Sequence, residues 1–146
     1  MEISGGLHIA TIWGSRSDSF RNGNKMTTWL TICDTCKREG WQPDSPTDGA
    51  LLAELVESCD PGPVRVRRYS CLMGCAHGCN VTVQAAGKIC YTIGRFEPTA
   101  TAGQAILDWA RLHAESESGQ VPYRLWPEAI KGHFISRHPP LPGTGA

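Results

Sequence analysis

Cys71-Leu-Met-Gly-Cys75-Ala-His77-Gly-Cys79 is the stretch on which the organisation of this chain depends. It places three cysteines at four-residue spacing. Residues 64–69 before it alternate apolar and basic side chains, and residues 81–84 after it are rich in β-branched residues. Both patterns are typical of β-strands. The stretch is therefore predicted to be a cysteine-rich loop between two strands.

A second cysteine group, Cys33-Asp-Thr-Cys36, lies upstream. It directly follows residues 27–32, Thr-Thr-Trp-Leu-Thr-Ile, whose β-branched and aromatic side chains predict another strand. Each cysteine group thus follows a predicted strand.

Two helices and a hairpin complete the pattern. Asp48 is the expected N-cap of the first helix, and residues 101–104 have the capping-box spacing expected at the start of the second, with Gly119 as its stop. Residues 81–84 and 89–93 form a hairpin around a turn at residues 86–88. The apolar faces of the two helices are Leu51, Leu52, Leu55, Val56 and Cys59, and Ala102, Ala105, Ile106, Trp109 and Leu112.

The order strand, helix, strand predicts a parallel pair with a right-handed crossover, which the hairpin extends in the antiparallel direction. Loops that leave the carboxyl ends of parallel strands lie at one edge of the sheet, so the two cysteine groups should converge. We expect an α/β fold with a mixed four-stranded sheet and two main helices. The expected organisation is a loose leader (1–25), one domain (26–119), and an extension with a flexible tail (120–146).

The composition of the chain limits the classes of function that the protein can have. Fourteen basic residues balance fourteen acidic ones, so no net charge attracts nucleic acid or an anionic membrane. No apolar run approaches the roughly 20 residues that cross a bilayer, and the N-terminus lacks a signal-peptide pattern. We therefore expect a cytoplasmic protein. In that reducing compartment, clustered cysteines bind metal or do redox work more often than they form disulfides.

The residues around the cysteines suit a thiolate site. Gly74 and Gly78 allow close approach of the backbone, and Lys37 and Arg38 would favour deprotonated thiols. His77 is adjacent to the site and is expected beside it rather than as a ligand. Cys59 and Cys90 are expected to pack in the core, on a helix face and inside a strand. Arg65 and Arg67 share one face of their strand, as a solvated edge or as a docking point for an acidic redox partner.

From residue 27 to about residue 119 the chain resembles the thioredoxin-like [2Fe-2S] ferredoxins, a group that includes the small iron-sulfur subunit of respiratory NADH dehydrogenase. The resemblance is most specific at Cys71-Leu-Met-Gly-Cys75 and the strand that follows. The full chain more closely resembles a family of predicted metal-binding proteins of unknown function. The motifs that it shares with this family are Cys33-Asp-Thr-Cys36, Cys71 to Cys79, and Pro127-Glu-Ala-Ile-Lys-Gly-His133.

The resemblance implies a thioredoxin-like ferredoxin fold in which Cys33, Cys36, Cys71 and Cys75 hold a [2Fe-2S] cluster, with Cys79 close enough to substitute. The ferredoxins space their first two ligands more widely than Cys33 and Cys36. The implied function is a non-catalytic electron carrier that serves an unidentified redox partner protein. Bacterial relatives suggest a link to cobalamin synthesis, and relatives of this fold form homodimers.

Two alternatives use the same cysteines. Four thiolates suit a structural or metal-handling Zn²⁺ site equally well. A thiol-disulfide oxidoreductase could use Cys33 and Cys36, although that chemistry favours a helix that starts at the cysteines, and Gly40, Pro43 and Pro46 interrupt one. No Ser/His/Asp set, phosphate-binding loop or pair of carboxylates supports hydrolysis or nucleotide chemistry.

Overall fold

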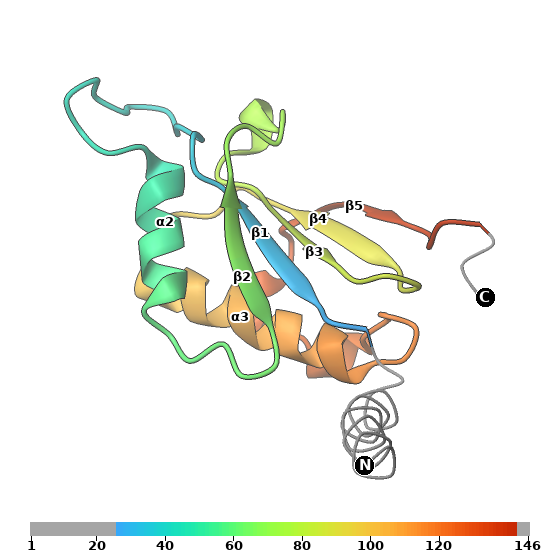
Figure 1. The fold of residues 1–146 in the computed structure, drawn as a ribbon. Coiled ribbons are helices and arrows are strands. Elements are labelled where there is room, and N and C mark those ends of the chain that lie inside the picture. The colour runs from blue at the N-terminus through green and yellow to red at the C-terminus, as the bar shows by residue number, and fades with distance from the viewer. Residues whose placement is uncertain (1–25, 143–146) are drawn as a thin grey trace, which may run out of the picture.

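The computed structural model describes residues 26–142, which form one sheet covered by two helices (Figure 1). Short 3-10 turns occur at Cys75–His77 (η1), Tyr123–Leu125 (η2) and Glu128–Ile130 (η3). The helices and strands, in chain order, are β1 (Trp29–Cys33), α2 (Asp48–Glu57), β2 (Arg65–Tyr69), β3 (Val81–Gln84), β4 (Cys90–Ile93), α3 (Ala100–Glu115) and β5 (Phe134–His138).

The sheet is mixed, with the strand order β2-β1-β3-β4-β5. β1 and β2 are parallel, and every other neighbouring pair is antiparallel. The predicted α/β class, the parallel pair around α2 and the β3–β4 hairpin are therefore confirmed.

The expected four-stranded sheet is wrong by one strand. Residues 134–138, which the sequence analysis placed in the extension after residue 119, form β5 and pair with β4. Phe134 at the start of β5 packs against the core and stacks on Trp126 with ring centres 4.4 Å apart, whereas the last three residues are exposed. The segment Phe-Ile-Ser-Arg-His therefore lacks the alternation of apolar and polar residues that would predict a strand. The sheet therefore extends past the domain boundary drawn at residue 119. The leader (1–25) and residues 143–146 lie outside the described residues.

Threonines start both helices. The Thr47 hydroxyl accepts from the Ala50 amide at 3.1 Å, and the Thr99 hydroxyl accepts from the Ala102 amide at 3.1 Å. The expected N-cap at Asp48 and the expected start at residues 101–104 are therefore displaced by one or two residues. The second helix also ends at Glu115, before the predicted stop at Gly119.

Both helices cover the same face of the sheet and pack against each other (Figure 1). Leu30 and Ile32 of β1 meet Val56 of α2 and Trp109 of α3 in a core where all four side chains are fully buried. This packing holds the carboxyl ends of β1 and β2 in place at the upper edge of the sheet. Within residues 26–142, no helix combines the length and the apolar character required to cross a bilayer.

Candidate metal centre

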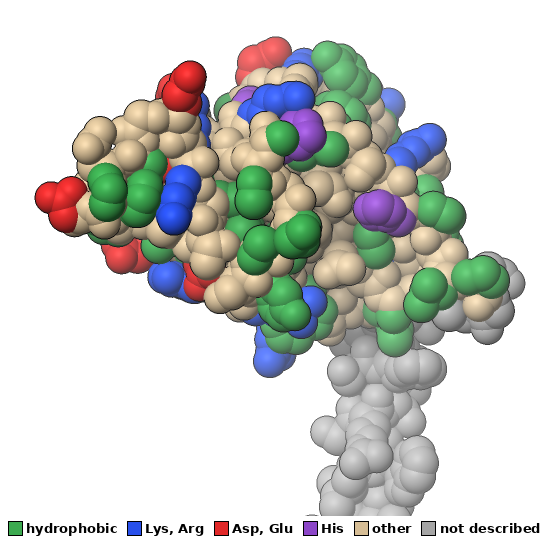
Figure 2. All heavy atoms as spheres, turned by 90° about the horizontal axis from the view of Figure 1, so that it is seen from above, with side chains coloured by type: hydrophobic (Ala, Val, Ile, Leu, Met, Phe, Trp, Pro, Cys, Tyr) green, Lys and Arg blue, Asp and Glu red, His purple; other side chains and the backbone are tan. Residues whose placement is uncertain are grey.

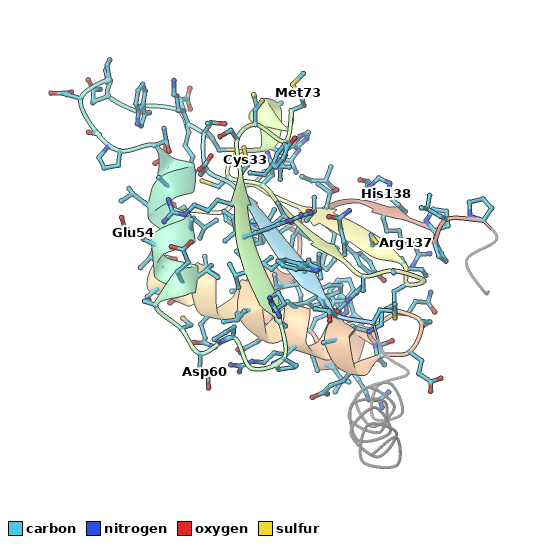
Figure 3. The ribbon with its side chains drawn as sticks, in the orientation of Figure 1. Cys33, Glu54, Asp60, Met73, Arg137 and His138 are labelled. Atoms are coloured by element: carbon cyan, nitrogen blue, oxygen red, sulfur yellow. The ribbon has the colours of Figure 1, made fainter. Side chains whose placement is uncertain are left out.

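The two cysteine loops meet at this upper edge. Cys33 and Tyr69 are aligned at the ends of the parallel strands, and the Asp34 amide donates to the Tyr69 carbonyl at 3.2 Å. The Leu72 amide lies 3.4 Å from Cys33 Sγ. Figure 3 shows Met73 on the second loop above Cys33. The topology therefore brings the backbone of the second loop onto the first cysteine.

Cys33 and Cys36 are buried, with 2% and 3% of their surfaces exposed. The start of α2 presses on their loop, because the Gly49 amide donates to the Cys36 carbonyl at 3.0 Å. A Cβ at Gly49 would overlap the Cys33 carbonyl oxygen. The Thr47 hydroxyl also donates to the Asp34 carbonyl at 2.5 Å. A glycine at the start of α2 thus allows the first pair to be enclosed.

The two thiols of this pair differ in proton affinity. Burial raises the pKa of Cys33, but hydrogen bonds from the Leu72 amide, the Thr35 hydroxyl and the Cys36 thiol outweigh it, and the net pKa is lowered. Burial and the neighbouring Cys33 raise the pKa of Cys36 to about 12. Cys33 is therefore the preferred thiolate, and Cys36 is the thiol that donates to it.

Asn80 joins the two loops, and the sequence reading missed it. Its side-chain nitrogen donates to Cys36 Sγ at 3.4 Å and to the Gly74 carbonyl at 2.8 Å. Only 1% of Asn80 is exposed, and its Oδ1 has no hydrogen-bond partner in the structure. The available signal was a polar residue between Cys79 and an apolar strand. A buried asparagine at such a position needs partners that only a nearby loop can supply.

The thiols of the second loop are exposed. Cys71 and Cys75 both lie at the surface, and Cys71 Sγ is 3.6 Å from Met73 Sδ. Cys71 and Met73 have φ angles of +67° and +63°, which side chains seldom adopt. Among residues 26–142, no group of three or more His, Cys, Asp or Glu side chains is arranged to hold a metal ion. The loops converge, but the exposed Cys71 and Cys75 do not form a metal-binding group with the buried Cys33 and Cys36 among the described residues.

Cys79 is the third buried thiol, with 0% of its surface exposed. Burial, followed by the negative charge of Asp48, raises its pKa to about 12. Its charge also raises the pKa of Cys36, which places it in the same electrostatic environment as the first pair. The residue considered as a substitute ligand therefore lies deeper in the fold than Cys71 and Cys75.

Four further thiol and imidazole residues in the described part of the chain make their contacts outside this cluster. Cys59 lies past the far end of α2 and donates to the Leu55 carbonyl at 3.4 Å. Cys90 opens β4, opposite His138. His77 ends η1, and its carbonyl, rather than its ring, makes the hydrogen bond to the Arg95 amide at 2.8 Å. His133 stacks on Phe96 with ring centres 4.3 Å apart.

The donor chemistry of the site fits a thiolate-bound group. Two N–H donors, the Leu72 amide and the Asn80 side chain, point at Cys33 and Cys36 sulfur. Hydrogen bonds to coordinating sulfur are a recurrent feature of iron-sulfur sites. A Cβ at Gly78 would come within 3.6 Å of Cys36 Sγ, so the backbone of the second loop closely approaches the first pair.

A family model described as a protein of unknown function, DUF1636, matches residues 30–140. The matched segment contains both cysteine loops and all five strands apart from the first residue of β1. No curated protein and no solved structure matches the chain.

Proposed function

The chain belongs to the DUF1636 family of proteins of unknown function, and from that premise we propose that it is an electron carrier that binds a [2Fe-2S] cluster. The proposed ligands are Cys33, Cys36, Cys71 and Cys75. The observation that carries the proposal is the pair of N–H donors aimed at Cys33 and Cys36 sulfur, both from the second cysteine loop, with Leu72 inside that loop and Asn80 at its end.

The fold supports this proposal. The parallel β1–α2–β2 unit, the β3–β4 hairpin and a helix after the hairpin follow the order expected of a thioredoxin-like ferredoxin. β5 is an addition at the outer edge of the sheet, next to β4. A thioredoxin-like scaffold is thus part of the proposal.

The second loop has to close for four thiolates to converge. Cys71 and Cys75 are exposed, and the loop that carries them has no regular secondary structure apart from η1. The backbone of this loop already reaches the first pair, because the Leu72 amide lies 3.4 Å from Cys33 Sγ. Cys33 and Cys36, fixed by β1 and the start of α2, would form the rigid half of the site.

A bound [2Fe-2S] cluster would supply one-electron redox chemistry. The protein groups have defined tasks around it. The Leu72 amide and Asn80 stabilise charge on the two inner sulfurs, and the buried core beneath Cys33 excludes water from one side. The exposed second loop leaves the other side accessible, as exchange of electrons with a partner requires.

Anaerobic purification followed by iron, sulfide and zinc assays tests the proposal, with visible and EPR spectra recorded on the same sample. The expected result is about two iron and two sulfide atoms per chain and a centre that becomes EPR-active on reduction. Stoichiometric zinc without sulfide would contradict the electron-carrier proposal and show that the cysteines form a structural or metal-handling zinc site.

A thiol-disulfide oxidoreductase is the second candidate, and the lowered pKa of Cys33 beside the Cys36 thiol favours it. In that reaction Cys33 thiolate would attack a substrate disulfide, and Cys36 would then displace the substrate thiol and leave a Cys33–Cys36 disulfide. Burial of both residues to 2–3% exposure restricts access of a protein disulfide. A metal-free protein with a redox-active Cys33–Cys36 pair would establish this candidate.

A further inference from the structure

A basic cleft opens beside the second cysteine loop. Its volume is about 360 Å³, and Cys75 contributes to its wall together with Lys37, Arg38 and Arg95. Glu39 is the one acidic residue in the lining. Figure 2 looks down on this end of the molecule and shows basic and hydrophobic side chains intermingled on it.

Acidic groups compensate the positive charge of this cleft only in part, with the Asp48 carboxylate accepting from the Arg38 backbone amide at 2.6 Å. Arg38 approaches Glu97 at 3.9 Å, the outer limit for an ion pair, and the Lys37 ammonium lies over the Trp41 ring at 4.4 Å. Across the described residues 26–142, Arg95 makes no ion pair. The whole chain has a formal net charge of zero. The local excess of positive charge in the cleft therefore results from the fold and not from the overall composition.

The basic surface continues away from Cys75. A neighbouring cavity of about 390 Å³ has Arg38 and Arg95 in its wall together with one acidic residue, Glu97, and reaches Thr99, the N-cap of α3, and His133. The Arg95 backbone is held there, because its amide donates to the His77 carbonyl at 2.8 Å. Two arginines thus stand between the second cysteine loop and the start of α3.

We propose that this cleft, formed by Lys37, Arg38 and Arg95, docks the acidic surface of the protein that exchanges electrons with the cysteine site. The inference rests on the proposed function and specifies the partner class. Met73, 84% exposed on the same loop, adds an apolar contact beside the charged residues. Protein interfaces commonly combine such methionines with arginine. Complementary charge speeds association and fixes orientation.

The arginines of β2 lie outside this cleft. Arg65 and Arg67 lie over the Trp29 ring, each with its guanidinium carbon 5.4 Å from the ring centre. Trp29 begins β1 and Cys33 ends it. Arg65 is aligned with Trp29 at the start of β1, and Arg67 is aligned with Thr31 in its middle and donates to the Thr31 hydroxyl at 2.7 Å. Both arginines are therefore farther along the strands from Cys33 than Tyr69, which is aligned with it.

Binding of a fluorescently labelled oligoglutamate peptide, measured by anisotropy, tests the docking without requiring a cluster. The variants are Lys37→Glu and the double variant Arg38→Glu/Arg95→Glu, with Arg124→Glu as the matched control in η2, outside both cavities. We expect the cleft variants to weaken binding by tenfold or more, and the control to weaken it by about twofold or less. Equal losses in cleft and control variants would overturn the proposal.

Electron transfer supplies the second measurement. The reduced protein gives one electron to ferricyanide, an anionic oxidant, or to tris(phenanthroline)cobalt(III), a cationic one. The double cleft variant should slow the ferricyanide reaction by about tenfold and leave the cobalt reaction as fast or faster. If the wild-type protein and all variants lack the cluster, the proposed function is refuted. The peptide-binding measurement does not need the cluster and would still test the docking site. Displacement of the peptide by sulfate at constant ionic strength would reduce the cleft to a small-anion site and overturn the proposal.

Discussion

The side-chain nitrogen of Asn80 lies 3.4 Å from Cys36 Sγ and, at the same time, 2.8 Å from the Gly74 carbonyl. One buried amide therefore connects the cysteine of the first loop to the backbone of the second. No other side chain described in the structure donates to both loops.

Replacing Asn80 with alanine should reduce the free energy of unfolding by roughly 1–3 kcal/mol, because the half-buried Gly74 carbonyl and the buried Cys36 sulfur lose their donor. Asn80→Asp is the matched variant, since it keeps the shape but replaces the donor with an oxygen. Chemical denaturation of the metal-free protein measures both. An Asn80→Asp protein as stable as the wild type would show that the hydrogen bonds are not what holds the loops together.

Gly49 and Gly103 form a natural pair for testing how closely α2 presses on the first cysteine loop. Both are buried glycines inside helices. A Cβ at Gly49 would overlap the Cys33 carbonyl, whereas a Cβ at Gly103 would meet Leu55 and Val56 at ordinary distances of 3.4–3.5 Å. Gly49→Ala should therefore destabilise the protein despite the better helix propensity of alanine.

We expect Gly103→Ala to change the free energy of unfolding by about 1 kcal/mol or less, in the stabilising direction if propensity dominates. Gly49→Ala should cost on the order of 2 kcal/mol or more. Thermal and chemical denaturation of the two variants provide the comparison. A neutral Gly49→Ala protein would mean that the loop can move away from α2 without loss.

Cys71→Ser and Cys75→Ser should each abolish the visible absorption of the cluster, because a serine hydroxyl is a poor substitute for a thiolate ligand. Cys59→Ala and Cys90→Ala are the controls, since these residues lie at the far ends of α2 and β4. Iron and sulfide content should fall in the first pair and remain in the second. Colour lost only from the control variants would place the site elsewhere.

Cys79 provides a separate test of ligand choice. It is fully buried near Cys36, so Cys79→Ala should leave the absorption of the cluster in place in an otherwise unchanged protein. Residual absorption in Cys71→Ser would indicate that Cys79 takes over as ligand, and the double variant Cys71→Ser/Cys79→Ala should then lose it. If Cys79→Ala alone is colourless, Cys79 is a primary ligand.

His113 predicts a pH dependence of stability. Its ring is fully buried, with Nδ1 2.9 Å from the Thr28 hydroxyl and Nε2 2.7 Å from the Ile89 carbonyl. Burial, with the charge of Lys88, lowers its pKa from 6.5 to about 4 against the raising effect of the Ile89 hydrogen bond. The unfolded chain therefore binds a proton between pH 6.5 and 4 that the folded chain does not.

Stability should be complete above about pH 6.5 and fall as the pH drops to about 4, by roughly 3 kcal/mol from this residue. His113→Gln should remove that part of the slope and leave the contribution of the carboxylates. Urea denaturation at a series of pH values gives both curves. Parallel curves for the two proteins would show that His113 is not responsible.

The sequence alone determined the main architecture. Strong local patterns placed the strand before Cys33, the alternating strand after residue 63 and the hairpin of β3 and β4. The strand-helix-strand order then required a parallel pair with both loops at one edge. Such predictions succeed because periodicity and connection rules are local.

Other features needed partners that lie far away in the chain. β5 depends on the free edge of β4. The helix starts, in contrast, depend on local sequence, and Thr47 and Thr99 lie only one or two residues from the starts expected from the sequence. Asn80 gains its role from Cys36 and Gly74, and sequence spacing does not reveal hydrogen bonds across loops.

The same distinction between sequence and tertiary structure applies to the cysteines. The sequence determined which of them follow strands, and the tertiary structure decided that Cys33, Cys36 and Cys79 are buried while Cys71 and Cys75 face solvent. It also decided that Lys37, Arg38 and Arg95 share one wall beside Cys75. Burial and local charge depend on how α2 and α3 pack across the sheet, because these helices and loops meet only in the folded chain.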